Sequence, residues 1–329
     1  MDYIFLIIGF FLLIKGADIF VSGAAAISKK LGIPSVIVGL TVVSLGTSAP
    51  ELAVSVISSI QGSNDIAVGN VLGSNIFNTL MVLGVTIIIM PLIIKKETIK
   101  KDFIINILIT ILFLILTFNG ILFGGQNYIS RLDGIILLII CVTYIGFLVW
   151  SVKKGNVIKV DKLDEEISVE VVLSEDINIG KSILKIIIGI AGIVIGGNIV
   201  VDSASAIATA WGMSEKLVGL TIVAMGTSLP ELVTSAVAAL KGEEDMALGN
   251  ILGSNIFNIL LIIGISSVIS PILVSSTLIV DFVFLIVVTL FIGIVVFFNK
   301  GEEKRLGRIH GIIFVLLYAS YIMYIIFRN

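Results

Sequence analysis

The sequence contains very few of the residues that form disulfides, bind soft metals or give a protein a charged surface. Its 329 residues include one cysteine, Cys141, and one histidine, His310, and only 13% of the residues are charged. A single cysteine excludes a disulfide within the chain. The net charge of −2 does not point to a charged partner, and no nucleic-acid partner is expected.

Long apolar runs fill most of the chain instead. Hydrophobic residues make up 57% of the sequence, which is typical of a membrane protein rather than of a soluble domain. Helices are the expected spans, because backbone polar groups in lipid have to be paired within the segment. The runs are continuous rather than alternating, which argues against a membrane β-barrel. We interpret the apolar start of the chain as a first span rather than as a removed signal.

Ten apolar runs are long enough to cross a membrane, and they fall into two sets of five. They lie at about 3–27, 35–60, 66–93, 103–123 and 133–152, and at about 182–209, 215–240, 246–273, 278–298 and 309–327. Residues 153–180 between the sets are polar and acidic, so we interpret them as a solvated linker. The sequence therefore predicts a five-helix unit at 1–152, a linker at 153–180 and a second five-helix unit at 181–329.

The two units are copies of each other at a constant spacing of 180 residues. Without a gap, 25 of the 47 positions in Gly39–Val85 are identical in Gly219–Ile265. Four of the five prolines keep the same spacing, namely Pro50 with Pro230 and Pro91 with Pro271. We conclude that one ancestral unit has been duplicated.

Five spans per unit is an odd number, so the second unit has to enter the membrane in the opposite orientation to the first. With the N-terminus outside, the external loops carry only Arg131, Lys216 and Arg328, and nearly all other basic loop residues are cytoplasmic. The predicted fold class is an all-α polytopic membrane protein with ten transmembrane helices as two inverted five-helix repeats. We expect it in the cell membrane, with both termini outside and the linker in the cytoplasm. Inverted repeats are typical of secondary transporters.

A proline interrupts the second span of each unit. The sequence GTSAPE occupies 46–51, and GTSLPE occupies 226–231. Pro50 has no N–H and clashes with the carbonyl group of Gly46, so the helix is expected to kink or unwind at this point. Backbone carbonyls freed in lipid are costly, but at a cation site they are ligands.

Hydroxyl, amide and carboxylate side chains surround this break, and their spacing places their oxygens on shared helix faces. In the first unit they are Thr47, Ser48 and Glu51 in the second span (i, i+1, i+4) and Asn70, Ser74 and Asn78 in the third (i, i+4, i+8). The second unit repeats them as Thr227, Ser228, Glu231, Asn250, Ser254 and Asn258.

These ligands are all hard oxygens, which disfavours zinc or copper. Two carboxylates neutralise one divalent cation, and Ca²⁺ takes about 6–8 oxygens in flexible geometry. Smaller groupings of the same oxygens suit Na⁺. Alone, Glu51 could be a protonated residue that only forms hydrogen bonds. Its repetition as Glu231 favours an ion site, because two unpaired carboxylates in a membrane demand a cation or a proton.

The motifs GTSAPE with GNVLGSNIFN, and GTSLPE with GNILGSNIFN, resemble the α-repeats of the calcium/cation antiporter superfamily, in particular prokaryotic sodium/calcium exchangers. The resemblance covers the whole chain in span number, repeat placement and topology. It implies that the first and sixth spans slide across the core bundle to give alternating access. It also implies no enzymatic activity and no cofactor, with Ca²⁺ and Na⁺ as transported ions.

The resemblance also assigns roles to individual residues. It implies that the two motif glutamates coordinate Ca²⁺ and Na⁺, with further ligands from hydroxyls, amides and backbone carbonyls. The implied metal ligands are Glu51, Glu231, Thr47, Thr227, Ser48, Ser228, Ser74, Ser254, Asn78 and Asn258, with Ser44 and Ala224 offering backbone carbonyls. We expect the protein to work in the lipid bilayer as a monomer.

One departure from the family pattern bears on the coupling ion. Some archaeal members and the potassium-dependent branch carry Asp at the position of Asn258, so K⁺ co-transport is not expected here. The proton-coupled branch usually has a GNxxE-type motif in place of GTSxPE. We therefore expect Na⁺/Ca²⁺ exchange, with Ca²⁺/H⁺ exchange as the main alternative. A passive cation channel is a further alternative. An intramembrane hydrolase is another, but it would need a base next to its nucleophile, and no His or Asp accompanies the motif serines.

Overall fold

The protein is predominantly helical in a computed structural model that describes residues 1–62, 64–94, 98–153, 178–213, 222, 224–298 and 304–328. Most of the predicted linker, 154–177, lies outside these described residues. The first part of the chain forms α1 (Asp2–Leu31), α2 (Ser35–Val38), the π-helical η1 (Gly39–Val43), α3 (Ser44–Thr47), α4 (Ala49–Ile60), α5 (Asn64–Phe77), the π-helical η2 (Asn78–Val82), α6 (Leu83–Ile89), β1 (Leu92–Ile94), α7 (Thr98–Thr117), α8 (Asn119–Phe123), β2 (Tyr128–Ile129) and α9 (Arg131–Lys153).

The second part repeats this order with few differences. It forms α11 (Ile179–Ala210), α13 (Ala224–Gly226), α14 (Leu229–Leu240), α15 (Glu244–Phe257), the π-helical η4 (Asn258–Ile263), α16 (Gly264–Ile269), β3 (Ile272–Leu273), the 3₁₀ turn η5 (Ser276–Leu278), α17 (Ile279–Phe298), β4 (Lys304–Leu306) and α18 (Arg308–Arg328).

Seven helices of the described residues are long and apolar enough to cross a membrane, and an eighth results if the bent pair Ser35–Thr47 and Ala49–Ile60 is one span. The prediction of a helical polytopic membrane protein is therefore confirmed, while the number ten stays a prediction. The predicted fourth span contains α7, which begins with the charged residues Lys100, Lys101 and Asp102. The predicted seventh span contains the short α14, and residues 214–221 and 223 lie outside the described residues.

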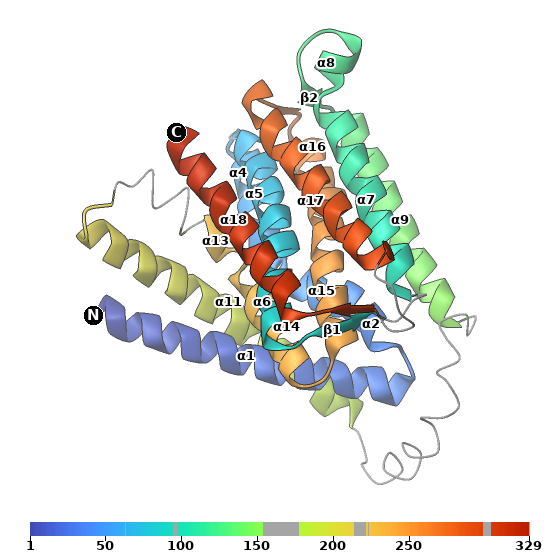
Figure 1. Ribbon diagram of the computed structural model, residues 1–329, viewed down its shortest axis with the longest axis vertical. Coiled ribbons are helices and arrows are strands. Elements are labelled where there is room, and N and C mark those ends of the chain that lie inside the picture. The colour runs from blue at the N-terminus through green and yellow to red at the C-terminus, as the bar shows by residue number, and fades with distance from the viewer. Residues whose placement is uncertain are drawn as a thin grey trace.

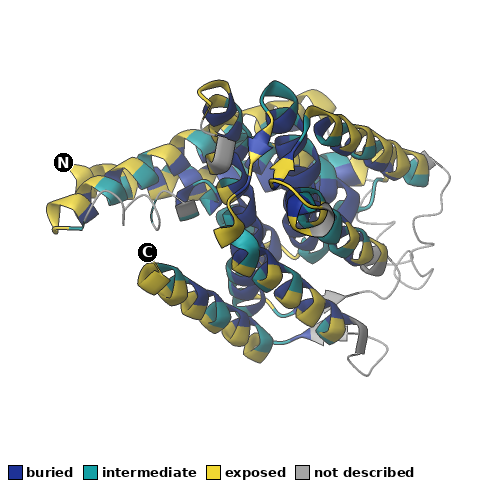
Figure 2. Cartoon of the chain, turned by 90° about the horizontal axis from the view of Figure 1, so that it is seen from above, coloured by how far each residue is buried: buried dark blue, intermediate teal, exposed yellow. Residues whose placement is uncertain are grey.

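Two long continuous helices form the centre of the bundle. In an 18-residue apolar stretch of the spans Ile66–Ile89 and Glu244–Ile269, 72% and 83% of the residues are buried, against 22–44% in the corresponding stretches of the other candidate spans. Figure 2 shows that the outer faces of the surrounding helices are exposed while their inner faces are buried. Because the exposed faces carry many large apolar side chains, they fit a lipid environment.

Helices α1 and α11 lie side by side and cross the rest of the bundle at a steep angle (Figure 1). Glycines allow their backbones to touch, because a Cβ at Gly16 would lie 2.7 Å from the backbone nitrogen of Ile193 and one at Gly23 would lie 2.8 Å from the carbonyl oxygen of Ser182. Contacts of this kind are the usual basis of helix packing in membranes, where small residues permit close approach. The two helices are antiparallel, because the later glycine of α1, Gly23, contacts the earlier residue of α11.

An ion pair links α1 to the end of α14. The Nζ atom of Lys241 lies 2.7 Å from Oδ1 of Asp18 and donates to Oγ of Ser22 at 2.5 Å. Both charged side chains are partly exposed, so this pair adds little to overall stability. It marks the turn of α1 that lies next to the end of α14.

Two short antiparallel sheets, which the all-helical prediction did not include, join the two parts of the chain. Strand β1 pairs with β4, and strand β2 pairs with β3. Strands β1 and β3 each directly follow a proline of the repeat, Pro91 and Pro271. In Figure 1, β1 and β2 lie at opposite ends of the bundle.

The predicted interruption at Pro50 is confirmed. Helix α3 ends at Thr47, α4 begins at Ala49, and the two segments are bent by 48°. In the second part of the chain, α14 begins at Leu229 after a turn at Thr227 and Ser228. Proline occupies the first turn of both α4 and α14, where its missing N–H costs nothing because that group has no intrahelical partner.

Candidate ion-binding site

The two motif glutamates lie at the start of the half-helices that follow the breaks. Glu51 is in the first turn of α4 and Glu231 in the first turn of α14, and both side chains are fully buried. A carboxylate at this position interacts favourably with the positive end of the helix dipole. The breaks therefore place two fully buried carboxylates inside the bundle, each at a helix start that partly compensates its charge.

Serines from opposite halves of the chain bind the glutamates reciprocally. Oγ of Ser228 donates to Oε1 of Glu51 at 3.0 Å, and Oγ of Ser48 donates to Oε1 of Glu231 at 2.8 Å. The sequence spacing predicted convergence of Ser48 with Glu51 on one helix face, but the hydrogen bond runs to the other half instead. The reason is the break at Ser48, which turns the following helix away.

The second oxygen of each glutamate is left for another partner. Oε2 of Glu51 and Oε2 of Glu231 are buried and have no hydrogen-bond partner in the described part of the chain. A buried carboxylate oxygen without a partner is costly. These two atoms are therefore the strongest acceptors available to a cation or a proton in this site.

The serines of the two central helices complete the hydroxyl set. Oγ of Ser74 on α5 lies 3.0 Å from Oγ of Ser228, within hydrogen-bond distance. Ser254 on α15 donates to Oε1 of Glu231 at 3.4 Å. Both serines are fully buried, so the structure brings these two predicted residues into contact with the glutamate–serine pairs.

The motif threonines contact asparagines of the opposite half. Oγ1 of Thr47 lies 3.1 Å from Oδ1 of Asn250, and Oγ1 of Thr227 lies 3.5 Å from Oδ1 of Asn70. The threonine hydroxyl donates in each pair, because an amide oxygen can only accept. The two halves therefore exchange threonine–asparagine contacts in the same way as serine–glutamate contacts.

Asn70 and Asn250 belong to the polar set that the repeat indicated, but the family resemblance named neither of them as a metal ligand. The amide of Asn70 donates to the backbone carbonyl of Glu51 at 3.3 Å and to Ser55 at 3.1 Å. That of Asn250 donates to the carbonyl of Glu231 at 3.5 Å and to a serine, Ser235, at 2.9 Å. Their recurrence at the spacing of 180 placed both in the predicted set, and their amides hold the backbone next to the glutamates.

Asn78 and Asn258 begin the π-helical segments η2 and η4 and are buried. Both side-chain atoms of Asn78 and Oδ1 of Asn258 have no hydrogen-bond partner among the described residues. A π-helical turn is a rare interruption that is frequent at functional sites. These two amides therefore supply further uncommitted polar atoms at the centre of the bundle.

The two predicted backbone ligands are less well defined. Ser44 is buried, and its carbonyl oxygen accepts from the backbone N–H of Ser48 at 3.0 Å and lies 3.3 Å from Oγ1 of Thr47. Ala224 begins α13, and its side chain lies outside the described set. Coordination by either carbonyl stays a prediction.

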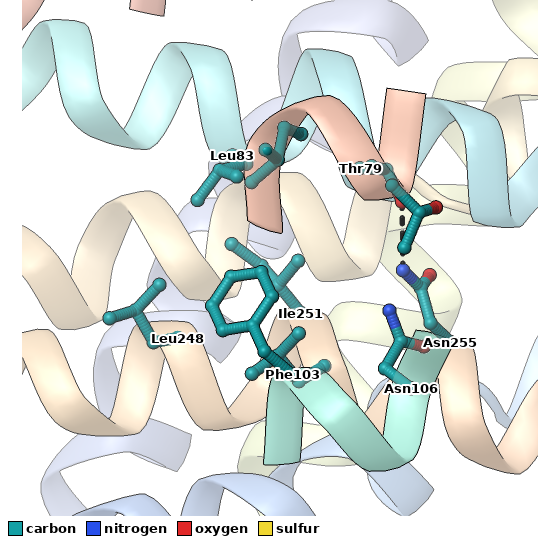
Figure 3. A pocket seen from close by; sticks show the side chains of 10 residues that line it. Thr79, Leu83, Phe103, Asn106, Leu248, Ile251 and Asn255 are labelled. Carbon is teal, nitrogen blue, oxygen red and sulfur yellow. Dashed lines mark hydrogen bonds between the residues drawn. The ribbon is translucent and has the colours of Figure 1, made fainter. Parts of the chain in front are cut away.

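A small cavity lies beside the central helices, apart from the glutamates. It measures about 10 Å³ and is lined by apolar side chains and by Thr79, Asn106, Asn255 and Thr289. Figure 3 shows the amide of Asn255 donating to Thr79, at 2.9 Å, with Asn106 beside it. This volume is roughly what one water molecule needs. The cavity includes no predicted ion ligand.

The donor atoms of this candidate site are hard oxygens from carboxylate, hydroxyl and amide side chains. Among the described residues no three His, Cys, Asp or Glu side chains come together as metal ligands, and the only cysteine, Cys141, is buried in the apolar core. Two carboxylates with surrounding hydroxyls and amides suit Na⁺ or Ca²⁺ better than a transition metal. Buried carboxylates at broken helices in a membrane bundle define a class, namely helical membrane proteins that move ions.

Comparison with known proteins identifies the family. The family described as "Sodium/calcium exchanger protein" matches residues 1–153 and 181–327. The putative antiporter CaxA of Alkalimonas amylolytica is 37% identical over 99% of this chain and 98% of its own length. The sodium/calcium exchanger MaX1 of Methanosarcina acetivorans is 30% identical over 98% of both chains.

Solved structures agree with this result. A structure of the sodium-calcium exchanger NCX_Mj, soaked with zero Na⁺ and Ca²⁺, superposes with a TM-score of 0.80 at 31% identity and covers 98% of each chain. The chain therefore belongs to the sodium/calcium exchanger family, which consists of transporters. The resemblance seen in the sequence motifs is confirmed.

Proposed function

We propose that the protein is a secondary antiporter that exchanges Na⁺ for Ca²⁺ by alternating access. One observation carries the proposal. Each of the two fully buried glutamates accepts a hydrogen bond from a serine of the other half, and each keeps one carboxylate oxygen without a hydrogen-bond partner among the described residues. Their two negative charges can be balanced by one Ca²⁺ or by several Na⁺, but not by both at once. An empty site with two buried charges is unfavourable in lipid, so only loaded forms reorient.

We further propose which residues bind the ions. Glu51 and Glu231 coordinate both ions through Oε2, and the adjacent hydroxyls and amides complete the shell. The full proposed set is Glu51, Glu231, Thr47, Thr227, Ser48, Ser228, Ser74, Ser254, Asn78 and Asn258, with the backbone carbonyls of Ser44 and Ala224. Ser74 and Ser254 are assigned to Na⁺, because the family resemblance implies that these two positions are outer Na⁺ ligands.

The proposal includes ten spans in two inverted repeats, at 1–152 and 181–329, joined by a cytoplasmic linker at 153–180. Two observations support it. The glutamate and threonine contacts are exchanged between the halves residue for residue, and the strand pairs at opposite ends of the bundle use equivalent elements, β1 with β4 and β3 with β2. An inverted repeat with its substrate site at the repeat interface accounts for both.

The coupling ion is tested by flux into sealed vesicles. With purified protein in proteoliposomes, an imposed Na⁺ gradient is expected to drive ⁴⁵Ca²⁺ uptake at constant pH with a protonophore present. Uptake should collapse when external and internal Na⁺ are equal. A pH gradient that drives Ca²⁺ uptake without Na⁺ would replace our proposal with Ca²⁺/H⁺ exchange. Uptake that needs no counter-ion would indicate a passive channel.

The orientation is tested by cysteine labelling in intact cells. We propose that the protein lies in the cell membrane with both termini outside, which places 126 outside and 30 in the cytoplasm. Gln126→Cys is expected to react with an impermeant maleimide, and Lys30→Cys only after permeabilisation. Both positions are exposed, and Cys141 is buried, so the parent should give a low background. Labelling of position 30 from outside would reverse the orientation.

A further inference from the structure

Three asparagines link the central helices next to the proposed ion site. The side-chain amide of Asn75 donates to the backbone carbonyl oxygen of Asn255 at 3.2 Å. The side-chain amide of Asn258 donates in turn to Oδ1 of Asn75 at 3.0 Å. All three residues are 1–2% exposed, so water does not compete for these bonds.

This arrangement fixes the direction of both side chains. An amide can be turned over with almost no change of shape, and only its partners decide which end points where. A backbone carbonyl can only accept, so the NH₂ group of Asn75 has to face Asn255. Oδ1 of Asn75 then faces Asn258 and requires a donor, which is the NH₂ group of Asn258. The carbonyl of Asn255 thereby determines the orientation of Asn258 through Asn75.

The free end of Asn258 is therefore its oxygen. Oδ1 of Asn258 is buried and has no hydrogen-bond partner in the described part of the chain, whereas an inverted amide would present two N–H donors in its place. A cation is attracted by the first arrangement and repelled by the second. Asn78, at the equivalent position of the first half, has no such anchor, since neither of its side-chain atoms has a described partner.

We propose that Asn75 is a positioning residue that holds the Asn258 side chain with its oxygen toward the transported cation. The proposal rests on the proposed function insofar as Asn258 is a cation ligand. Asn255, which corresponds to Asn75 in the second half, does not play the same part, because its side chain turns to Thr79 at the small cavity (Figure 3). The two halves therefore differ in how their central amides are held.

The test compares Asn75→Leu with Asn258→Leu and with the double variant. Without Asn75, the Asn258 amide can invert, and the energy of an ion in a dipole field scales with the charge of the ion. We expect the half-saturating concentration to rise about tenfold for Ca²⁺ and about threefold for Na⁺, with maximal flux nearly unchanged, because the ion–dipole energy doubles with the charge. Adding Asn75→Leu to Asn258→Leu should not raise the half-saturating concentrations further, since Asn75 acts only through the side chain of Asn258.

A matched control is available in the chain. Asn255→Leu removes an amide that is equally buried and occupies the equivalent position, but keeps the backbone carbonyl that anchors Asn75. Its half-saturating concentrations are expected to stay within about twofold of the parent, because only the bond to Thr79 is lost. Asn75→Ala repeats the main test with a smaller side chain that avoids overpacking.

Ca²⁺-induced thermal stabilisation of each variant in detergent provides a readout that does not depend on exchange. If the parent showed no Na⁺-driven flux but was stabilised by Ca²⁺, the proposed function would be rejected. The positioning role would then be decided by the Ca²⁺-induced stabilisation of the variants. Additive effects of Asn75→Leu and Asn258→Leu would overturn the positioning role. So would loss of folded protein in both Asn75 variants, which would show that Asn75 supports the fold instead.

Discussion

Glu51→Gln and Glu231→Gln should each lower Ca²⁺ transport by at least about a hundredfold, because removing one partner of a buried charge group costs roughly 3–5 kcal/mol and 1.4 kcal/mol is a factor of ten. Either change leaves one carboxylate against two positive charges. Each also replaces a buried carboxylate by an amide, which offers the ion one oxygen instead of two. The measurement is initial ⁴⁵Ca²⁺ uptake into Na⁺-loaded proteoliposomes.

The same variants should not be less stable than the parent in the absence of cations. Two buried carboxylates close to each other are unfavourable without a counter-ion, and glutamine has the same shape without the charge. Thermal unfolding without Ca²⁺ should therefore occur at the same temperature or higher, and the stabilisation on adding Ca²⁺ should disappear. This pattern separates loss of the ion site from loss of the fold.

Asp133→Asn is the matched control, since it makes the same change of carboxylate to amide away from the site. Asp133 accepts hydrogen bonds from the backbone N–H and the hydroxyl of Ser130 at 2.8 and 2.7 Å, at the start of α9. Its loss weakens a helix cap, worth about 0.5–2 kcal/mol, but not Ca²⁺ transport. Near-normal uptake by either glutamine variant would show that the two-carboxylate site is wrong.

The repeat made much of the site predictable, because residues that share an environment recur at the spacing of 180. Glu51 and Glu231 were expected to be buried near each other, and both are fully buried and bound by serines of the opposite half. The break before each glutamate followed from Pro50 and Pro230, since proline cannot continue a helix without losing a hydrogen bond.

The partners within the site could not be predicted from helix spacing. Spacing places Ser48 near Glu51 on an unbroken helix, but the 48° bend after Thr47 sends Ser48 to Glu231. Only the packing of the two halves decides such a contact. Residue spacing along the sequence does not predict such a contact, because it describes one helix at a time.

The π-helical segments and the short strands also had no signal in the sequence. Segments η2 and η4 begin at Asn78 and Asn258 within the long central spans, for which hydropathy predicts only a helix. Strands β1 and β3 are two or three residues long and depend on pairing with β4 and β2. Such short strands form through their partners rather than through their own composition.

Close contact between α15 and the second span holds the site together, and it depends on two glycines. A Cβ at Gly249 would lie 2.9 Å from the backbone nitrogen of Leu40 and nearer still to the carbonyl oxygen of Val36. A Cβ at Gly39 would lie 3.0 Å from Cα of Gly249. Because these neighbours are backbone atoms, a side chain at either position cannot be accommodated by a change of rotamer.

Gly249→Leu is therefore expected to destabilise the protein by about 3 kcal/mol, the upper part of the range for overpacked cores. Gly146→Leu on α9 is the matched control, since a Cβ there meets nothing within 4 Å, and its effect should stay within about 0.5 kcal/mol. Thermal unfolding of the detergent-solubilised variants provides the comparison. Gly249 precedes Asn250, the partner of Thr47, so any Gly249→Leu protein that folds should also exchange Ca²⁺ poorly. A folded variant with normal stability and flux would disprove this close contact and the position of Asn250 that depends on it.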